Sequence, residues 1–203
     1  MPSANQLLSG QTPEEIVDWA AITSLRPVLT TNFRPHSIGL IHMVTNVLPD
    51  IPVLWVDSGY NTQATYQFVE LVLNRFNLNI HIYRPQPAFQ ECRPSVNSIP
   101  AIGSKQHESF VRHVKLEPFE RALAELQPDV WLTGIRADQT AYRRSLDTVS
   151  PGPRGITRIA PLLAWTEVDL EGYIYFNNLP DYDDYFDPTK GSDDRECGLQ
   201  TVS

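Results

Sequence analysis

The sequence predicts an α/β fold built on a doubly wound, mostly parallel sheet. Two patterns predict it. Apolar runs of strand length, such as residues 53–57 and 129–133, stop at a turn that contains glycine, which is typical of strands buried on both faces. Longer segments with apolar residues at helical spacing, such as residues 62–76, separate these runs. Parallel strands need crossover connections of this kind, so we expect the strands to run in parallel.

The elements follow in chain order from their end signals. Thr12, Pro13 and Glu15 predict the start of the first helix as its N-cap, its first helical residue and the partner in a capping box. Further helices are expected over residues 37–47, 62–76, 116–126 and 166–177. Strands are expected over residues 27–31, 53–57, 79–83, 129–133 and 158–163. Residues 85–106 are rich in Pro, Ser, Gln and Gly, which predicts a long loop.

The chain length predicts one domain with a tail. A chain of 203 residues is long enough for one buried α/β core and not for two. We expect that domain over residues 1–178. Residues 180–188 are acidic, aromatic and interrupted by proline, so residues 179–203 are expected to form a flexible C-terminal tail outside the core.

Composition excludes several classes of protein. The net charge of -8 argues against a protein that coats nucleic acid. Two cysteines are too few for a disulfide scaffold or a four-cysteine metal site, and the five histidines lack metal-site spacing, so no metal is expected. No targeting segment or membrane span is apparent, which predicts a cytoplasmic protein in a reducing compartment. Among the basic residues only Lys105, Lys115 and Lys190 are not arginine, and arginine suits phosphate or sulfate.

The loops that follow the first two strands are candidate ligand sites, because ligands of open parallel sheets bind outside the carboxyl ends of the strands. After the first strand, hydroxyls, an amide and an arginine precede a helix start, which suits an anion: Thr30, Thr31, Asn32, Phe33 and Arg34. An ordinary capped turn is the alternative. After the second strand, a glycine allows close approach of backbone to a ligand, although the same residues are common in turns: Asp57, Ser58, Gly59 and Tyr60.

The loop after the fourth expected strand is rich in arginine. It contains the candidate ligand-binding residues Gly134, Arg136, Gln139 and Arg143. Five arginines face two aspartates between residues 136 and 158, in a protein that is acidic as a whole. This contrast favours an anion site over the alternative, a solvated charged loop.

Cys197 lies close to the carboxyl terminus and is the candidate nucleophile. Terminal residues tend to be exposed, and a thiol reacts as its thiolate. The neighbouring acids Asp193, Asp194 and Glu196 disfavour the thiolate, whereas an arginine-lined pocket would favour it, so the tail would have to dock. An incidental surface cysteine is the alternative, and Cys92 is interpreted as structural or incidental.

Together these segments resemble the phosphoadenylyl-sulfate (PAPS) reductases. Residues 30–33 are similar to the family's Ser/Thr-Thr-Ser-Phe-Gly phosphate loop, and residues 56–60 to its Thr-Asp-Thr-Gly-Tyr segment. Residues 114–118 are similar to its Lys-Val-Glu-Pro stretch, and residues 134–140 to Gly-x-Arg-x-x-Gln-Ser. Residues 196–199 are similar to its terminal Glu-Cys-Gly-Leu-His. The matches keep the family's order over roughly residues 27–200.

The resemblance implies an adenine nucleotide α-hydrolase-like fold whose domain, residues 1–178, binds the substrate with the loops above and Lys115. It implies an oxidoreductase of sulfate assimilation and cysteine biosynthesis. The Cys197 thiolate would attack the sulfur of PAPS, expel adenosine 3′,5′-bisphosphate and form a cysteine S-sulfonate, from which thioredoxin or glutaredoxin would release sulfite. No bound cofactor is expected, because residues 110–115 lack the paired cysteines of the iron–sulfur relatives.

The sequence departs from the family at several positions. Asn32 replaces the loop serine, Arg34 and Pro35 replace a glycine-led turn, and Gln200 replaces the terminal histidine. The segment before the cysteine is shortened to residues 187–194. Three alternatives stay open: adenylyl sulfate as the substrate, an ATP-using relative of the same fold, and a nucleotide-binding protein whose tail has lost catalysis. A homodimer also stays open.

Overall fold

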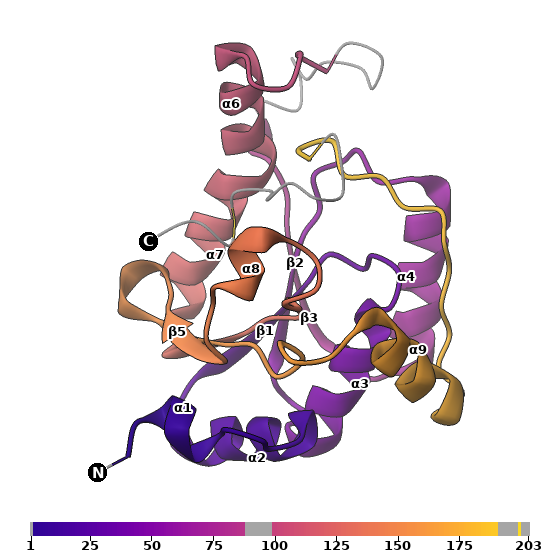
Figure 1. Cartoon of the computed structure of the whole chain (residues 1–203). Helices are drawn as coiled ribbons and strands as arrows, with labels where there is room; N and C mark the ends of the chain where they lie inside the picture. The colour runs from indigo at the N-terminus through magenta and orange to yellow at the C-terminus, as the bar shows by residue number, and fades with distance from the viewer. Residues whose placement is uncertain (1, 88–98, 191–198, 200–203) are drawn as a thin grey trace.

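The computed structural model describes residues 2–87, 99–190 and 199, and places a mixed sheet at the centre of the domain with helices on both faces (Figure 1). The strand order is β3-β2-β1-β4-β6-β5. The parallel strands are β1 (Pro27–Thr31), β2 (Pro52–Val56), β3 (Asn79–Tyr83), β4 (Val130–Leu132) and β6 (Thr157–Ile159). Among the strands of the described residues, only β5 (Val149–Pro151) runs antiparallel, beside β6. The predicted doubly wound, mostly parallel sheet is confirmed.

One face of the sheet carries the larger part of the core. It is covered by α2 (Pro13–Thr23), α3 (Ser37–Val47), α4 (Gln63–Arg75) and α9 (Glu167–Phe176). The other face packs against α7 (Glu117–Leu126), which follows α6 (Lys105–Val111) and the π-helical turn η2 (Arg112–Leu116). Side chains of one strand alternate between the faces: Val28 contacts the α7 side and Leu29 the α3 side. Short elements complete the described chain: α1 (Ala4–Leu7), α8 (Ala141–Arg144) and η3 (Pro153–Gly155).

Local signals position the helices that hold the site. Thr12 and Glu15 form the predicted capping box at the start of α2, with the Thr12 amide 2.7 Å from the Glu15 carboxylate. Helix α9 packs closely on α3 at Gly39, where an added Cβ would lie 2.5 Å from Leu170 Cδ1. The glycine therefore lets the two helices approach each other. No helix of the described chain has the length and apolar character that crossing a bilayer requires.

Six elements of the described chain were not predicted: α1, α6, η2, α8, β5 and η3. Helix α6 begins at Lys105, inside the segment expected to be a loop. Its start was missed because the N-cap residue, Ser104, follows a run of residues that are typical of turns. Strand β5 is only three residues long and ends in Pro151, which is compatible with an edge strand but gives no periodic signal.

The chain after α9 differs from the expected tail. Residues 179–190, here called the strap, run along α4 and towards α6 (Figure 1). The Tyr182 ring stacks on Phe68 at 4.5 Å, and its hydroxyl donates to the Phe33 carbonyl at 2.5 Å. The strap packs because its aromatic residues bury their rings while their hydroxyls find partners. This packing was not expected from the acidic composition of the strap. Apart from Leu199, the remainder of the expected tail lies outside the described residues.

Candidate active site

The candidate active site is a cavity at the carboxyl ends of β1 and β4. The chain winds away from β1 in both directions at this point, which is where ligands of open α/β sheets bind. Including its open mouth, the cavity has a volume of about 840 Å³. Its polar lining includes Thr30, Thr31, Asn32, Ser37, Thr133 and Gln139, and its apolar lining includes Leu29, Leu40, Ile41, Ile135, Leu162, Leu170 and Leu199.

The charge of the cavity is opposite to that of the protein. Arg34, Arg136, Arg143 and Lys190 line it, and no carboxylate does so among the described residues. The whole chain, in contrast, has a net charge of -8. A low-dielectric cleft lined by charges of one sign concentrates ligands of the opposite sign. The cavity therefore suits an anionic ligand that also has an apolar part.

The loop after β1 turns sharply to begin α3. The Thr31 hydroxyl accepts the Phe33 amide at 3.0 Å, and the Asn32 side-chain oxygen Oδ1 accepts the Arg34 amide at 3.3 Å. Phe33 and His36 adopt left-handed backbone conformations, with φ of 49° and 66°. The turn brings the amino end of α3 to the cavity, where the unpaired amides of a helix favour an anion.

Ser37, the first residue of α3, lines the cavity. Its hydroxyl is buried and makes no hydrogen bond with any described residue. A buried polar group without a partner is uncommon in folded proteins and points to a ligand or a water molecule. The sequence predicted the helix start here, but it gave no reason to single out this hydroxyl.

Two predicted residues of the same loop have structural partners. The Thr30 hydroxyl accepts the indole N–H of Trp131 at 2.7 Å and so ties β1 to β4. The Phe33 ring is fully buried and packs edge-on against Trp55 at 5.3 Å. Phe33 does not line the cavity, so its side chain supports the loop from within the core.

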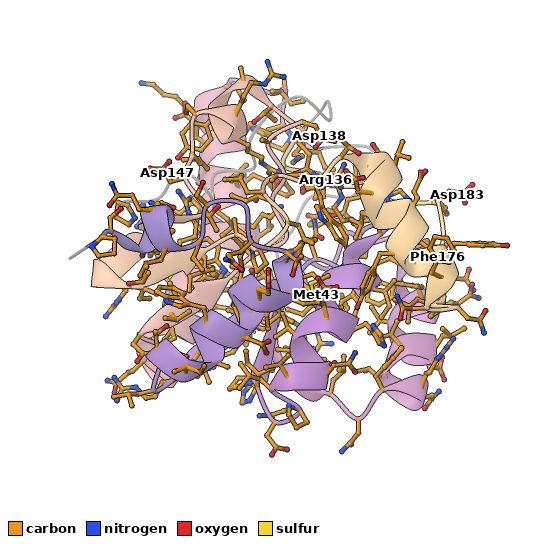
Figure 2. All side chains as sticks on the ribbon, turned by 60° about the horizontal axis from the view of Figure 1, so that its bottom comes forward. Met43, Arg136, Asp138, Asp147, Phe176 and Asp183 are labelled. Atoms are coloured by element: carbon orange, nitrogen blue, oxygen red, sulfur yellow. The ribbon has the colours of Figure 1, made fainter. Side chains whose placement is uncertain are left out.

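The loop after β4 brings together its four predicted residues. Gly134, Arg136, Gln139 and Arg143 all line the cavity. The Gln139 side-chain oxygen accepts the Arg136 amide at 3.0 Å and also accepts the Arg143 guanidinium. Arg136 is 3% exposed, and its Nε lies 3.1 Å from Asp138, beside the start of α9 (Figure 2). The guanidinium groups are therefore fixed before any ligand binds.

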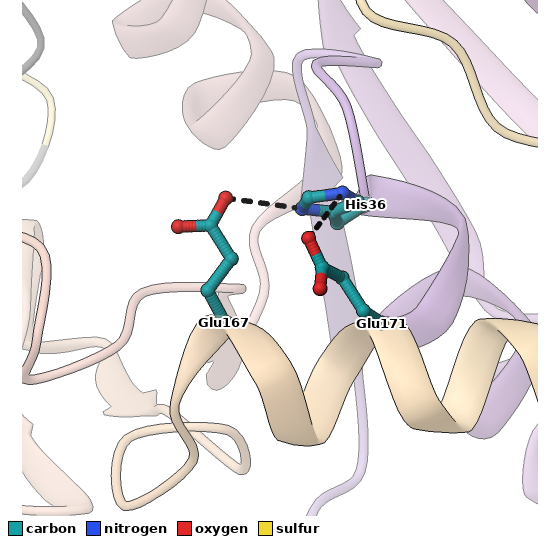
Figure 3. A group of neighbouring side chains, drawn as sticks. All are labelled: His36, Glu167 and Glu171. Carbon is teal, nitrogen blue, oxygen red and sulfur yellow. Dashed lines mark ion pairs between the residues drawn. The ribbon is translucent and has the colours of Figure 1, made fainter.

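His36 lies among carboxylates at the edge of the cavity. Its Nδ1 lies 3.5 Å from Glu167, and its Nε2 lies 3.8 Å from Glu171, both on α9 (Figure 3). Nε2 also lies 3.3 Å from Asp181 in the strap. The two ring nitrogens face different carboxylates, and a single metal ion would bind only one of them. The contacts of His36 join the loop after β1, α9 and the strap.

Asp57 organises the loop after β2. Its Oδ1 accepts the Gly59 amide at 3.0 Å and the Tyr66 hydroxyl at 2.9 Å, and its Oδ2 accepts Arg84 Nε at 3.0 Å. Gly59 has a φ of 79°, in the left-handed region that favours glycine. Tyr60 is buried, with its ring 5.2 Å from that of Phe110. Asp57, Gly59 and Tyr60 line neither the cavity nor the smaller hollow beside it, which is described next.

A smaller hollow of about 300 Å³ adjoins the cavity and shares Asn32 with it. Ser58, Lys115 and Asp187 line this hollow. Lys115 Nζ lies 2.6 Å from Asp187 Oδ2 and 3.2 Å from the Thr189 hydroxyl. Burial alone would raise the pKa of the Asp187 carboxyl, but the Lys115 ammonium and the Thr189 donors outweigh burial and hold that pKa below its ordinary value.

The structure thus gathers most of the predicted residues at one edge of the sheet. The cavity contains the eight predicted residues Thr30, Thr31, Asn32, Arg34, Gly134, Arg136, Gln139 and Arg143, and the hollow contains Ser58 and Lys115. Cys197, the predicted nucleophile, lies outside the described residues. Lys190 and Leu199, on either side of it in the sequence, both line the cavity. These two and His36 and Ser37 were not predicted as site residues.

Solved structures share this fold. The PAPS reductase of Candida auris, solved as a phosphate complex, superposes with a TM-score of 0.77 at 24% identity, covering 90% of this chain and 91% of that one. The NAD synthetase of Campylobacter jejuni superposes with a TM-score of 0.56 at 11% identity, covering 88% and 75% of the two chains. The chain thus has the doubly wound α/β fold that these proteins share, with a cavity at the switch point of its sheet.

The family model for the phosphoadenosine phosphosulfate reductase domain matches residues 26–186. The chain belongs to the phosphoadenosine phosphosulfate reductase family. It is 34% identical to the phosphoadenosine 5′-phosphosulfate reductase of a Synechocystis strain over 92% of this chain and 75% of that protein. It is 36% identical to the protein of the same name from a Synechococcus strain, over 90% of this chain and 79% of that protein.

Proposed function

We propose that the protein reduces PAPS to sulfite and adenosine 3′,5′-bisphosphate, with Cys197 as the nucleophile. One observation carries the proposal: Lys190 and Leu199, which flank the segment containing Cys197, both line the cationic cavity. We propose that Cys197 acts at this cavity because it precedes Leu199 by two positions in the sequence, and two residues of backbone span about 7 Å at most. Family membership supports the choice of substrate.

The cavity offers both polar and apolar lining for the two parts of a sulfonucleotide. Ser37, the amino end of α3 and the guanidinium groups of Arg136 and Arg143 suit its phosphates and sulfonate. The apolar lining suits the adenine ring, which gains free energy when it leaves water. The Gln139 side-chain oxygen accepts both the Arg136 backbone amide and the Arg143 guanidinium, so it joins these two positions of the loop after β4.

The proposed reaction has two steps. In the first, the Cys197 thiolate forms a bond to the sulfur of the sulfonate while the bond from that sulfur to the bridging phosphate oxygen breaks. The electron pair of the broken bond leaves with adenosine 3′,5′-bisphosphate, and the enzyme retains a cysteine S-sulfonate. Covalent catalysis of this kind divides a difficult transfer into two easier ones.

In the second step, a thiolate of reduced thioredoxin or glutaredoxin attacks the Cys197 sulfur, and sulfite departs with the electron pair of the S–S bond. The second thiol of the reductant then displaces Cys197 from the mixed disulfide. Two electrons thus pass from the dithiol to the sulfonate, and the reductant leaves as a disulfide. This chemistry requires a reducing compartment, and it does not require a resident cofactor. We therefore propose that the protein acts in cytoplasmic sulfate assimilation.

The cationic cavity would also stabilise a Cys197 thiolate, which the acidic residues beside Cys197 in the sequence disfavour. A thiol becomes a thiolate more readily beside arginine or lysine, because the positive charge stabilises the anion. Arg34, Arg143 and Lys190 line the cavity and carry such positive charges. Docking beside them would offset the effect of the acidic residues that precede Cys197 in the sequence.

The test is to incubate the reduced protein with PAPS and to measure its intact mass. We expect one added sulfonate, its removal by thioredoxin, and its absence from Cys197→Ser. Cys92→Ser is the matched control and should gain the sulfonate as the wild type does. If only adenylyl sulfate gives the adduct, adenylyl sulfate and not PAPS is the substrate. Release of pyrophosphate from ATP would favour the ATP-using alternative. Nucleotide binding without any adduct would contradict the proposed catalysis.

A further inference from the structure

The strap is held to the domain by contacts from several elements. The Thr62 hydroxyl at the start of α4 donates to the Asp184 carbonyl at 2.9 Å. The His36 amide donates to the Asp181 carboxylate at 2.9 Å. The Tyr182 hydroxyl donates to the loop after β1, as described above. The strap therefore crosses the edge of the sheet at which the cavity opens.

The most buried of the charged contacts in the strap is the ion pair of Lys115 and Asp187. The two side chains are 10% and 7% exposed. Asp187 also accepts the Thr189 amide at 3.0 Å and the Thr189 hydroxyl at 2.5 Å, which fixes the turn that leads to Lys190. The pair thus links the turn before Lys190 to η2, on the α7 side of the sheet.

We propose that Lys115 and Asp187 form a latch that positions Cys197 for attack, so that Lys115 acts on the reaction through the strap rather than as a ligand of the nucleotide. This inference rests on the proposed function. Asp187 lies ten residues before Cys197 in the sequence, and Lys190, which lines the cavity, follows Asp187 by three. Fixing Asp187 therefore fixes the point from which the chain that contains Cys197 departs.

The physical reason is the behaviour of buried charges and tethered reactants. A buried ion pair tolerates the loss of one partner poorly, because the other charge then stays buried and uncompensated. Neutralising either residue should therefore release the strap. A released strap lowers the fraction of time that the nucleophile spends near the bound sulfonate, which slows attack and leaves the nucleotide contacts intact.

The first experiment separates positioning from binding. Asp187→Asn, Lys115→Met and the double variant are compared with the wild type and with Asp183→Asn, a matched control on the exposed side of the strap (Figure 2). The readouts are the single-turnover rate of Cys197 sulfonation at saturating PAPS and the Kd for PAPS, which is measured by calorimetry with each substitution combined with Cys197→Ser so that the nucleotide is not consumed.

We expect each single variant to be sulfonated roughly tenfold more slowly or worse, with a Kd within about twofold of the wild type. The double variant should be no slower than the slower single variant, because both substitutions remove the same contact. Asp183→Asn should match the wild type. If Lys115→Met raises the Kd roughly tenfold and Asp187→Asn does not, Lys115 is a nucleotide ligand and the latch is wrong.

The second experiment does not depend on activity. Hydrogen–deuterium exchange is followed in residues 179–190 and, for comparison, in α4. We expect Asp187→Asn to accelerate exchange in the strap and not in α4, because the latch holds the strap alone. Unchanged exchange in the strap would overturn the latch. A wild type that gains no sulfonate would overturn the proposed function, while the exchange data would still decide whether the latch exists.

Discussion

The side-chain amide of Asn32 donates a hydrogen bond of 2.9 Å to the hydroxyl of Tyr185. Asn32 stands where the family's phosphate loop has serine, and Tyr185 lies in the strap. The same asparagine accepts the Arg34 amide, and it lines both the cavity and the adjoining hollow. The departure from the family pattern at this position thus makes a contact between the anion loop and the strap.

Tyr185→Phe tests this contact by removing one hydroxyl. The Asn32 amide loses a partner, so we expect the free energy of unfolding to fall by about 1 kcal/mol in urea denaturation. The Kd for adenosine 3′,5′-bisphosphate should rise a few-fold, roughly in proportion to the order lost in the loop. Tyr175→Phe, on an exposed ring of α9, is the control and should change neither quantity. Equal effects of the two substitutions would contradict the role of the contact.

Arg143→Met tests the charge of the cavity. Arg143 lines the cavity and is buried, whereas the adjacent Arg144 is exposed and does not line it. Because a charge-assisted hydrogen bond to an anion is lost, we expect the Kd for adenosine 3′,5′-bisphosphate to rise roughly tenfold or more by calorimetry. Arg144→Met should leave it within about twofold, since exposed charges are screened by solvent. A larger effect at Arg144 would place the anion elsewhere.

Phe33→Leu separates packing from binding in the loop after β1. The ring is buried against Trp55 and does not line the cavity. We expect the free energy of unfolding to fall by about 1 kcal/mol, the usual scale for a core substitution that keeps most of the volume. Nucleotide affinity should change by less than about threefold, which is within what a small loop adjustment produces. Strong loss of affinity with unchanged stability would mean that the ring itself contacts the ligand.

Asp129 gives a pH dependence of stability. Burial opposes the shift, but the Leu25 and Arg26 amides, 2.7 and 2.9 Å from the carboxylate, lower the pKa of Asp129. The folded protein therefore binds this proton less tightly than the unfolded chain, and the carboxylate contributes stability above pH 4 or so that is lost as the pH falls through the lowered pKa.

Asp129→Asn should accordingly reduce the free energy of unfolding by about 1 kcal/mol at pH 7, with allowance for partial exposure. The difference from the wild type should shrink in urea denaturation at pH 3. Asp183→Asn, on the exposed side of the strap, is the control substitution. A difference that is constant from pH 7 to pH 3 would remove the carboxylate from this role.

Periodic patterns made the fold predictable. The expected strand over residues 79–83 and the expected helix over residues 37–47 coincide with β3 and α3, because each has one dominant hydrophobic period. The strap carries no such period. Its packing depends on Tyr182 finding Phe68 and on Asp187 finding Lys115, contacts between residues that are distant in the sequence. Composition alone therefore indicated a tail.

The candidate site was predictable in its location and less so in its detail. The carboxyl ends of the strands pointed to the loops that contain Arg34 and Arg136, and these residues meet at one cavity. The carboxylate of Asp57 accepts hydrogen bonds from Gly59, Tyr66 and Arg84. The sequence could not predict this structural role, because short turns and ligand-binding loops use the same residue types.

The most direct measurement of the central claim is the amount of sulfite that the reduced protein releases from PAPS in the presence of thioredoxin. The account predicts one sulfite for each PAPS consumed, and none from Cys197→Ser although that variant still binds adenosine 3′,5′-bisphosphate. Release of sulfite by Cys197→Ser at the wild-type rate, or consumption of PAPS without sulfite, would contradict it.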